Sequence, residues 1–203
     1  PLADAFFVAF RIPNTFRRLF SEGTFNAAFV PSYSSVLDNK KKSQKFANNI
    51  FTLLTIGLFF LVLVIEIMMP IFVFLIAPGF EGDYQKMELA ITLTRITFPF
   101  LMFISLASFF SAILNSHNKF AVASAAPIIL NILLIGVLIF GKILNDQLVY
   151  YLSYAVTISG ILQLIFLYFF VKKHFSPKIN LSFKIDNKVK LFFKKLLPSI
   201  FSS

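Results

Sequence analysis

Every arginine of this 203-residue chain lies in an otherwise apolar stretch, and Arg11, Arg17 and Arg18 share the first such stretch with Asp4 and Glu22. Charges within a membrane-spanning segment cost roughly 2.5–3.5 kcal/mol each and therefore usually face a protein interior or a water-filled cavity. A guanidinium keeps its charge, and its planar fork binds phosphate through two parallel hydrogen bonds. These residues could therefore bind a phosphate-bearing anion.

The spacing of the charged residues predicts a polar stripe on a helix. In an unbroken helix, side chains seven or four positions apart return to the same face. The residues that share this face are Asp4, Arg11, Arg18 and Glu22. Pro13 removes a backbone donor and clashes with the preceding turn, and Gly23 weakens the helix again. We therefore expect a bent or interrupted segment that faces an internal cleft, because broken membrane helices usually line cavities.

The composition identifies an integral membrane protein. Hydrophobic residues make up 58% of the chain and the mean hydropathy is +0.81, whereas soluble domains are roughly 45–50% apolar. The net charge of +10 could suggest a nucleic-acid partner, but the lysines lie in short loops between apolar runs, so we expect none. The absence of cysteine excludes disulfides and thiolate metal sites.

Five apolar runs are long enough to span a bilayer, which takes about 20 helical residues. The expected spans are 1–36, 46–77, 89–114, 120–140 and 148–171. Together they predict an all-α transmembrane bundle, followed by a basic connector and the start of a further helix over 172–203. The chain starts at Pro1 and stops in a new apolar stretch, so we interpret it as part of a longer protein.

Lysine placement predicts the orientation of the bundle. Most of the nineteen basic residues lie in the loops 38–45 and 115–119 and in the connector, whereas the alternate loops hold only Lys86 and Lys142. Because basic residues accumulate on the cytoplasmic side of inner-membrane proteins, we place the lysine-rich loops there.

Some of the polar residues also have purely structural interpretations. Arg17 and Arg18 could extend to the headgroups, Arg95 could anchor its span, and Glu66 could be a water-facing carboxylate. His117 and the other loop histidine have no companion at ligand spacing, so no metal site is expected. No phosphate loop, nucleophile elbow or paired carboxylates appear, so we expect no cofactor, no catalytic residue and no enzyme activity.

The residues from Asp4 to Pro31 closely resemble the second transmembrane segment of the MurJ (MviN) family of lipid II flippases. Shorter matching runs extend the resemblance over nearly the whole chain. They are APGF from Ala77, RITFP from Arg95, ISLAS from Ile104, AILN from Ala112 and PIILNI from Pro127.

The resemblance implies a transporter of the bacterial inner membrane, with a fold of the multidrug/oligosaccharidyl-lipid/polysaccharide exporter type and two lobes around a cationic cavity. Residues 1–171 would form most of the N-terminal lobe. The family's functional aspartate and arginine align with Asp4 and Arg17, and Asn14 and Glu22 also lie in the family pattern. Straight-helix geometry instead places Arg18 beside Asp4, and a kink at Pro13 would reconcile the two.

The implied function is to move lipid II, the lipid-linked precursor of peptidoglycan, to the outer leaflet by alternating access. Its pyrophosphate would enter a cavity lined by Arg17, Arg18 and Arg11, while Asp4 would orient an arginine or break a pair as the lobes move. The expected partners are lipid II and membrane lipids, and the full-length protein is expected to be a monomer. The alternatives are a drug or polysaccharide-lipid exporter of the same superfamily, a membrane-embedded polyprenyl-phosphate transferase, and a structural bundle.

Overall fold

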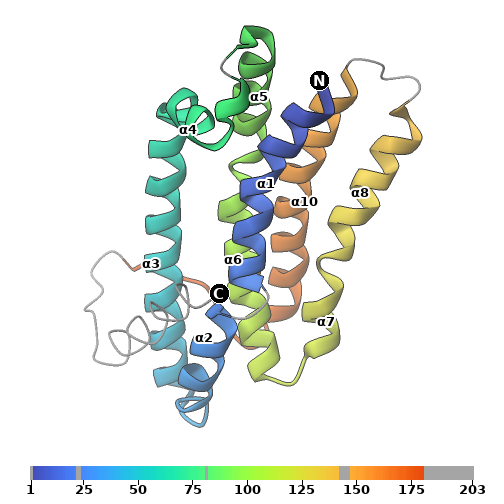
Figure 1. The fold of residues 1–203 in the computed structure, drawn as a ribbon. Coiled ribbons are helices and arrows are strands. Elements are labelled where there is room, and N and C mark those ends of the chain that lie inside the picture. Colours follow the sequence, from blue (N-terminus) through green and yellow to red (C-terminus); the bar gives the residue numbers. More distant parts are fainter. Residues whose placement is uncertain (1, 22–23, 81, 142–146, 181–203) are drawn as a thin grey trace.

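The computed structural model describes residues 2–21, 24–80, 82–141 and 147–180 (Figure 1). Over these ranges the chain forms α-helices and one short 3-10 helix and no strand, which confirms the expected all-α class. Four helical stretches of the described chain are long and apolar enough to cross a membrane. They are Lys40–Ile67, Tyr84–Ser116, Phe120–Ile139 and Leu148–Val171.

The first half of the chain folds into four helices and the 3-10 turn. Their bounds are α1 (Leu2–Ser21), α2 (Thr24–Ser34), α3 (Lys40–Ile67), α4 (Met69–Ile76) and η1 (Pro78–Phe80). Asn39 caps α3, because its side-chain oxygen accepts a hydrogen bond of 3.1 Å from the backbone amide of Lys42. Helix α3 stands at one side of the bundle, and α1 crosses in front of α6 (Figure 1).

In the second half, prolines separate consecutive helices that continue in nearly the same direction (Figure 1). Pro99 lies between α5 (Tyr84–Thr97) and α6 (Phe100–Ser116), and Pro127 lies between α7 (Phe120–Ala125) and α8 (Ile128–Ile139). Helix α10 (Leu148–Val171) is continuous. A proline cannot donate the backbone hydrogen bond that would join the two halves.

Pro13 behaves differently, and the interruption expected there does not occur. Helix α1 continues through Pro13 to Ser21. The proline frees the carbonyl four residues earlier, that of Ala9, and this oxygen accepts a 2.9 Å hydrogen bond from the hydroxyl of Thr97 on α5. A neighbouring helix thus supplies the donor that Pro13 lacks, as membrane helices with internal prolines require.

Helix α6 lies at the centre of the bundle and packs against α1, α2, α3 and α10. One apolar cluster joins α2, α3, α6 and α10, and in it the rings of Phe29 and Phe109 meet edge to face at 5.1 Å. A second cluster joins α1, α4 and α5 through small and aliphatic side chains, among them Ala9, Val73 and Leu93. The second cluster places the start of α1 against α5.

Helices α10 and α6 approach closely at Gly160. A Cβ atom at this position would lie 2.7 Å from Cδ2 of Phe100 and 3.1 Å from Cβ of Phe103. Phe100 is fully buried, so its ring has little room to move. The absence of a side chain at Gly160 therefore permits the contact between the two helices.

Two histidines join the end of α6 to the segment after α10. The rings of His117 and His174 are stacked with their centroids 4.1 Å apart, and Tyr33 of α2 meets His117 edge to face at 6.1 Å. Burial, with a smaller electrostatic contribution from His174, lowers the pKa of His117 below its usual 6.5.

This lowered pKa predicts a pH-dependent stability. As the pH falls through 6.5, the unfolded chain takes up a proton at His117 before the folded chain does, so the folded state loses stability toward acid. Thermal unfolding of the full-length protein in detergent, measured from pH 7.5 to 5, should show a smaller decrease in midpoint for His117→Gln than for the wild type. Equal decreases would contradict this assignment.

The segment after α10 is attached along α3. The side chain of Gln44 donates to the carbonyl of Ser176, Asn48 accepts from the amide of Lys178 at 2.8 Å, and the amide of Asn180 donates to the hydroxyl of Thr52 at 3.1 Å. The three residues of α3 are spaced by four positions and therefore share one face.

Candidate functional site

Helix α1 has a buried face of small residues. Ala5, Ala9 and Pro13 are all buried and are spaced by four, so they form one stripe. The stripe is on the side of α1 that packs against α5 and α6. Small side chains let membrane helices approach closely, and the hydrogen bond from Thr97 to Ala9 fixes α1 against α5.

The opposite face of α1 is exposed and carries charge. Asp4, Phe7, Arg11 and Thr15 follow one another at spacings of three or four, and all four are exposed. Asp4 and Arg11 therefore lie on the same side, as the spacing predicts. This face points away from the core that the described helices form. Because charged side chains avoid lipid, we expect this face to meet protein or water.

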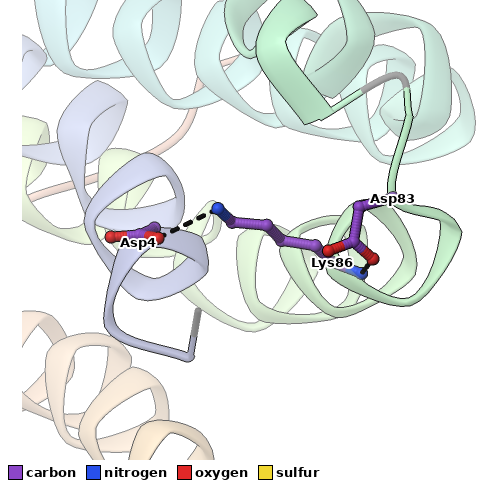
Figure 2. A network of polar contacts seen from close by, with 3 residues as sticks. All are labelled: Asp4, Asp83 and Lys86. Carbon is purple, nitrogen blue, oxygen red and sulfur yellow. Dashed lines mark hydrogen bonds and ion pairs between the residues drawn. The ribbon is translucent and has the colours of Figure 1, made fainter.

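The carboxylate of Asp4 forms an ion pair with a lysine of α5. The Nζ atom of Lys86 lies 2.9 Å from Oδ2 of Asp4, and Figure 2 shows the lysine side chain reaching from α5 to the first turn of α1. The Lys86 ammonium also lies 4.5 Å from the centroid of the Phe80 ring, within cation–π range. The side chain of Lys86 is 23% exposed and that of Asp4 is 56% exposed.

Local sequence explains the position of Lys86. Asp83 has an extended backbone and caps α5, with its Oδ1 atom accepting a 3.0 Å hydrogen bond from the Lys86 amide (Figure 2). This cap places Lys86 in the first turn of α5, next to the start of α1. From the sequence we expect Asp4 to orient an arginine, and the structure shows that a lysine also contacts its carboxylate.

The remaining predicted binding residues are described only in part. Asn14 is half-buried on α1, and Arg17 and Arg18 belong to the same helix. The side chains of these two arginines, and the whole of Glu22, lie outside the described residues. Their roles in binding remain predictions.

Sequence reasoning missed Lys86 as a partner of Asp4. It identified Lys86 only as one of the two lysines in the lysine-poor loops, and the run Asp83 to Lys86 does contain a helix-capping signal. No local pattern connects Lys86 with Asp4, because α1 and α5 are far apart in the sequence. Only the packing of α1 against α5 brings them together.

Glu66 of α3 is a second carboxylate that lies within an apolar helix. Its Oε1 atom is buried and has no hydrogen-bond partner among the described residues. Arg95 of α5 is near enough to interact with it electrostatically.

A cavity of about 910 Å³ lies away from this network, between the start of α3 and the segment after α10. Its lining is mostly lysines and amides, including Lys40, Lys45 and Asn48. The described residues contain no group of three or more histidine or acidic side chains that could hold a metal ion.

Comparison with known proteins identifies the family. A family model described as "Lipid II flippase MurJ" matches residues 1–203. A probable lipid II flippase MurJ of Rickettsia prowazekii (strain Madrid E) is 40% identical over 175 residues, which cover 85% of this chain and 34% of the relative. The lipid II flippase MurJ of Burkholderia cenocepacia is 38% identical over 162 residues, covering 79% and 31%.

The fold matches as well. A solved structure of lipid II flippase MurJ in an inward closed conformation aligns with a TM-score of 0.76 and 26% identity, covering all of this chain and 42% of that one. This chain thus spans about a third of the length of the Rickettsia and Burkholderia relatives. It is a multi-pass protein of the bacterial inner membrane. The sequence and fold matches together show that the chain belongs to the MurJ family of lipid II flippases.

Proposed function

We propose that this chain forms part of the N-terminal lobe of a transporter that moves lipid II from the cytoplasmic to the outer leaflet. The relatives are named for this activity, and this chain covers part of their length. The observation that carries the proposal is the exposed charged face of α1, which includes Asp4 and Arg11. It lies in the run that resembles the family most closely.

The physical argument starts from the cost of placing these charges in a membrane. The packing of Ala5, Ala9 and Pro13 against the lobe turns Arg11 away from the lobe's own core. An arginine inside a membrane needs water or an anionic ligand around its guanidinium group. The pyrophosphate of lipid II is such a ligand, and Arg11, Arg17 and Arg18 would bind it through charge-assisted hydrogen bonds.

Alternating access then requires that the cavity open to one side of the membrane at a time. The rest of the full-length protein would form the opposite wall, and the lipid tail would remain in the membrane. Lipid II is moved without chemical change, so the proposed activity is transport and needs no catalytic residue or cofactor. The proposed partners are lipid II and membrane lipids, without nucleic acid, and the proposed assembly is a monomer.

The direct test is to express the full-length protein in a bacterium depleted of its own lipid II flippase. We expect restored growth together with restored exposure of lipid II at the outer leaflet, measured with a membrane-impermeant enzyme that cleaves or labels exposed lipid II. Normal amounts of the protein in the membrane without restored exposure would contradict lipid II transport. Restored exposure of another polyprenyl-linked sugar alone would instead favour a different exporter of the superfamily.

A further inference from the structure

We propose that Lys86 is a positioning residue for transport: its ammonium group holds the carboxylate of Asp4 and thereby fixes the start of α1, with its charged face, against α5. The pair joins two helices through a 2.9 Å contact at the end of the bundle where both helices begin. The inference depends on the proposed function, because the role assigned to Lys86 is in that transport cycle.

Lys86 is the more constrained member of the pair. Its amide is bonded to the Asp83 cap, its ammonium lies over the Phe80 ring, and its side chain is 23% exposed. The side chain of Asp4 is 56% exposed and belongs to the first turn of its helix. A lysine restrained by the residues just before α5 therefore sets where the Asp4 carboxylate lies.

Among the described residues, two other acidic side chains near the start of α5 are placed differently. Asp83 uses its carboxylate to cap α5 through the Lys86 amide. Glu88 is exposed two positions further along the same helix, and residues two apart do not face each other on a helix. Asp4, on another helix, is thus the carboxylate through which Lys86 can fix one helix relative to another.

The position of α1 matters because its two faces have different roles. The buried face of Ala5, Ala9 and Pro13 offers only small side chains, which allow close approach but carry no charge that could pair with α5. The hydrogen bond from Thr97 to Ala9 fixes the middle of the helix, and the pair with Lys86 fixes its beginning. Without the pair, the beginning of α1 could move away from α5, and Arg11 would shift with it.

The test uses the full-length protein in flippase-depleted cells, with lipid II exposure measured as a rate and normalised to the amount of protein in the membrane. Lys86→Met keeps a long apolar side chain but removes the charge, and we expect a rate at least about fivefold lower, the lower range for coupling between two sites. Lys86→Arg keeps the charge and should retain most of the rate. Lys172→Met is the matched control, because the ammonium of Lys172 also lies over a ring, that of Phe169 at 5.0 Å, and its rate should not change.

A charge exchange separates this role from simple packing. Asp4→Lys and Lys86→Asp should each lose activity, and the double variant should recover a substantial part of it. A wild-type rate for Lys86→Met, or equal losses for Lys86→Met and Lys86→Arg, would overturn the positioning role while leaving lipid II transport intact. If the exchanged proteins fail to accumulate, the comparison of Lys86→Met with Lys86→Arg still shows whether the charge of Lys86 is required. A wild-type protein that exposes no lipid II would overturn the proposed function, and this role with it.

Discussion

Replacing Arg17 by alanine in the full-length protein should abolish rescue of flippase-depleted cells and lower the rate of lipid II exposure on the order of 10- to 100-fold. A hydrogen bond to a charged group is worth about 1.5–3 kcal/mol, and each 1.4 kcal/mol corresponds to about tenfold. Arg17→Lys keeps the charge but loses the two-pronged geometry, so its loss should be smaller. An arginine that only reaches the headgroups would tolerate both changes.

The same assay distinguishes Arg17 from Arg18. Because α1 continues through Pro13, position 18 lies seven residues after Arg11 and returns to the side of the helix that Arg11 occupies, whereas the family pattern selects position 17. Loss of activity in Arg18→Ala but not in Arg17→Ala would show that Arg18, the residue selected by helix spacing, binds the substrate. Normal growth and normal exposure with both Arg17→Ala and Asp4→Asn would refute the assignment of the binding site.

The second large effect concerns stability. The free energy of unfolding of Gly160→Ala should be about 1–3 kcal/mol lower than that of a control glycine-to-alanine variant, which is the usual cost of overpacking. The reason is that the added carbon would lie 2.7 Å from the buried ring of Phe100. Gly136→Ala of α8 is the matched control, since a Cβ there meets no atom within 4 Å. Both changes gain the same helix propensity, roughly 1 kcal/mol, so their difference isolates the steric contact.

The measurement is thermal or denaturant unfolding of the full-length variants in the same detergent. Gly136→Ala should match or exceed the stability of the wild type, and Gly160→Ala should fall below it. Equal stabilities would mean that α10 moves away from α6 at no cost.

Much of the fold could be predicted from the sequence because the signals are local. Apolar runs long enough to span a bilayer indicate membrane helices, and Pro99 and Pro127 lie where one helix ends and the next begins. Pro13 shows why such local signals are insufficient. Like Pro99 and Pro127, it removes a backbone hydrogen-bond donor. Thr97, which is distant in sequence, supplies the missing donor to the carbonyl of Ala9, so the helix continues.

Of the candidate site, the relative placement of two residues was predictable. The spacing of Asp4 and Arg11 places them on one face of a helix, and the structure exposes both on that face. The ion pair with Lys86 was not predictable, because it depends on which helix packs beside the start of α1. From the sequence, only an arginine partner is expected for Asp4, because helix spacing places Arg18 on the face of Asp4 and the family pattern points to Arg17.

The contacts between α3 and the segment after α10 restrict the amino acids allowed on α3 more than those allowed in the segment. Gln44, Asn48 and Thr52 contribute side chains, whereas Ser176, Lys178 and Asn180 contribute main-chain groups in these contacts. Every amino acid carries the same carbonyl, and every one except proline carries the same amide. Substitutions in the segment, other than to proline, therefore leave these main-chain groups in place, whereas a substitution to alanine at Gln44, Asn48 or Thr52 removes the group that forms the bond.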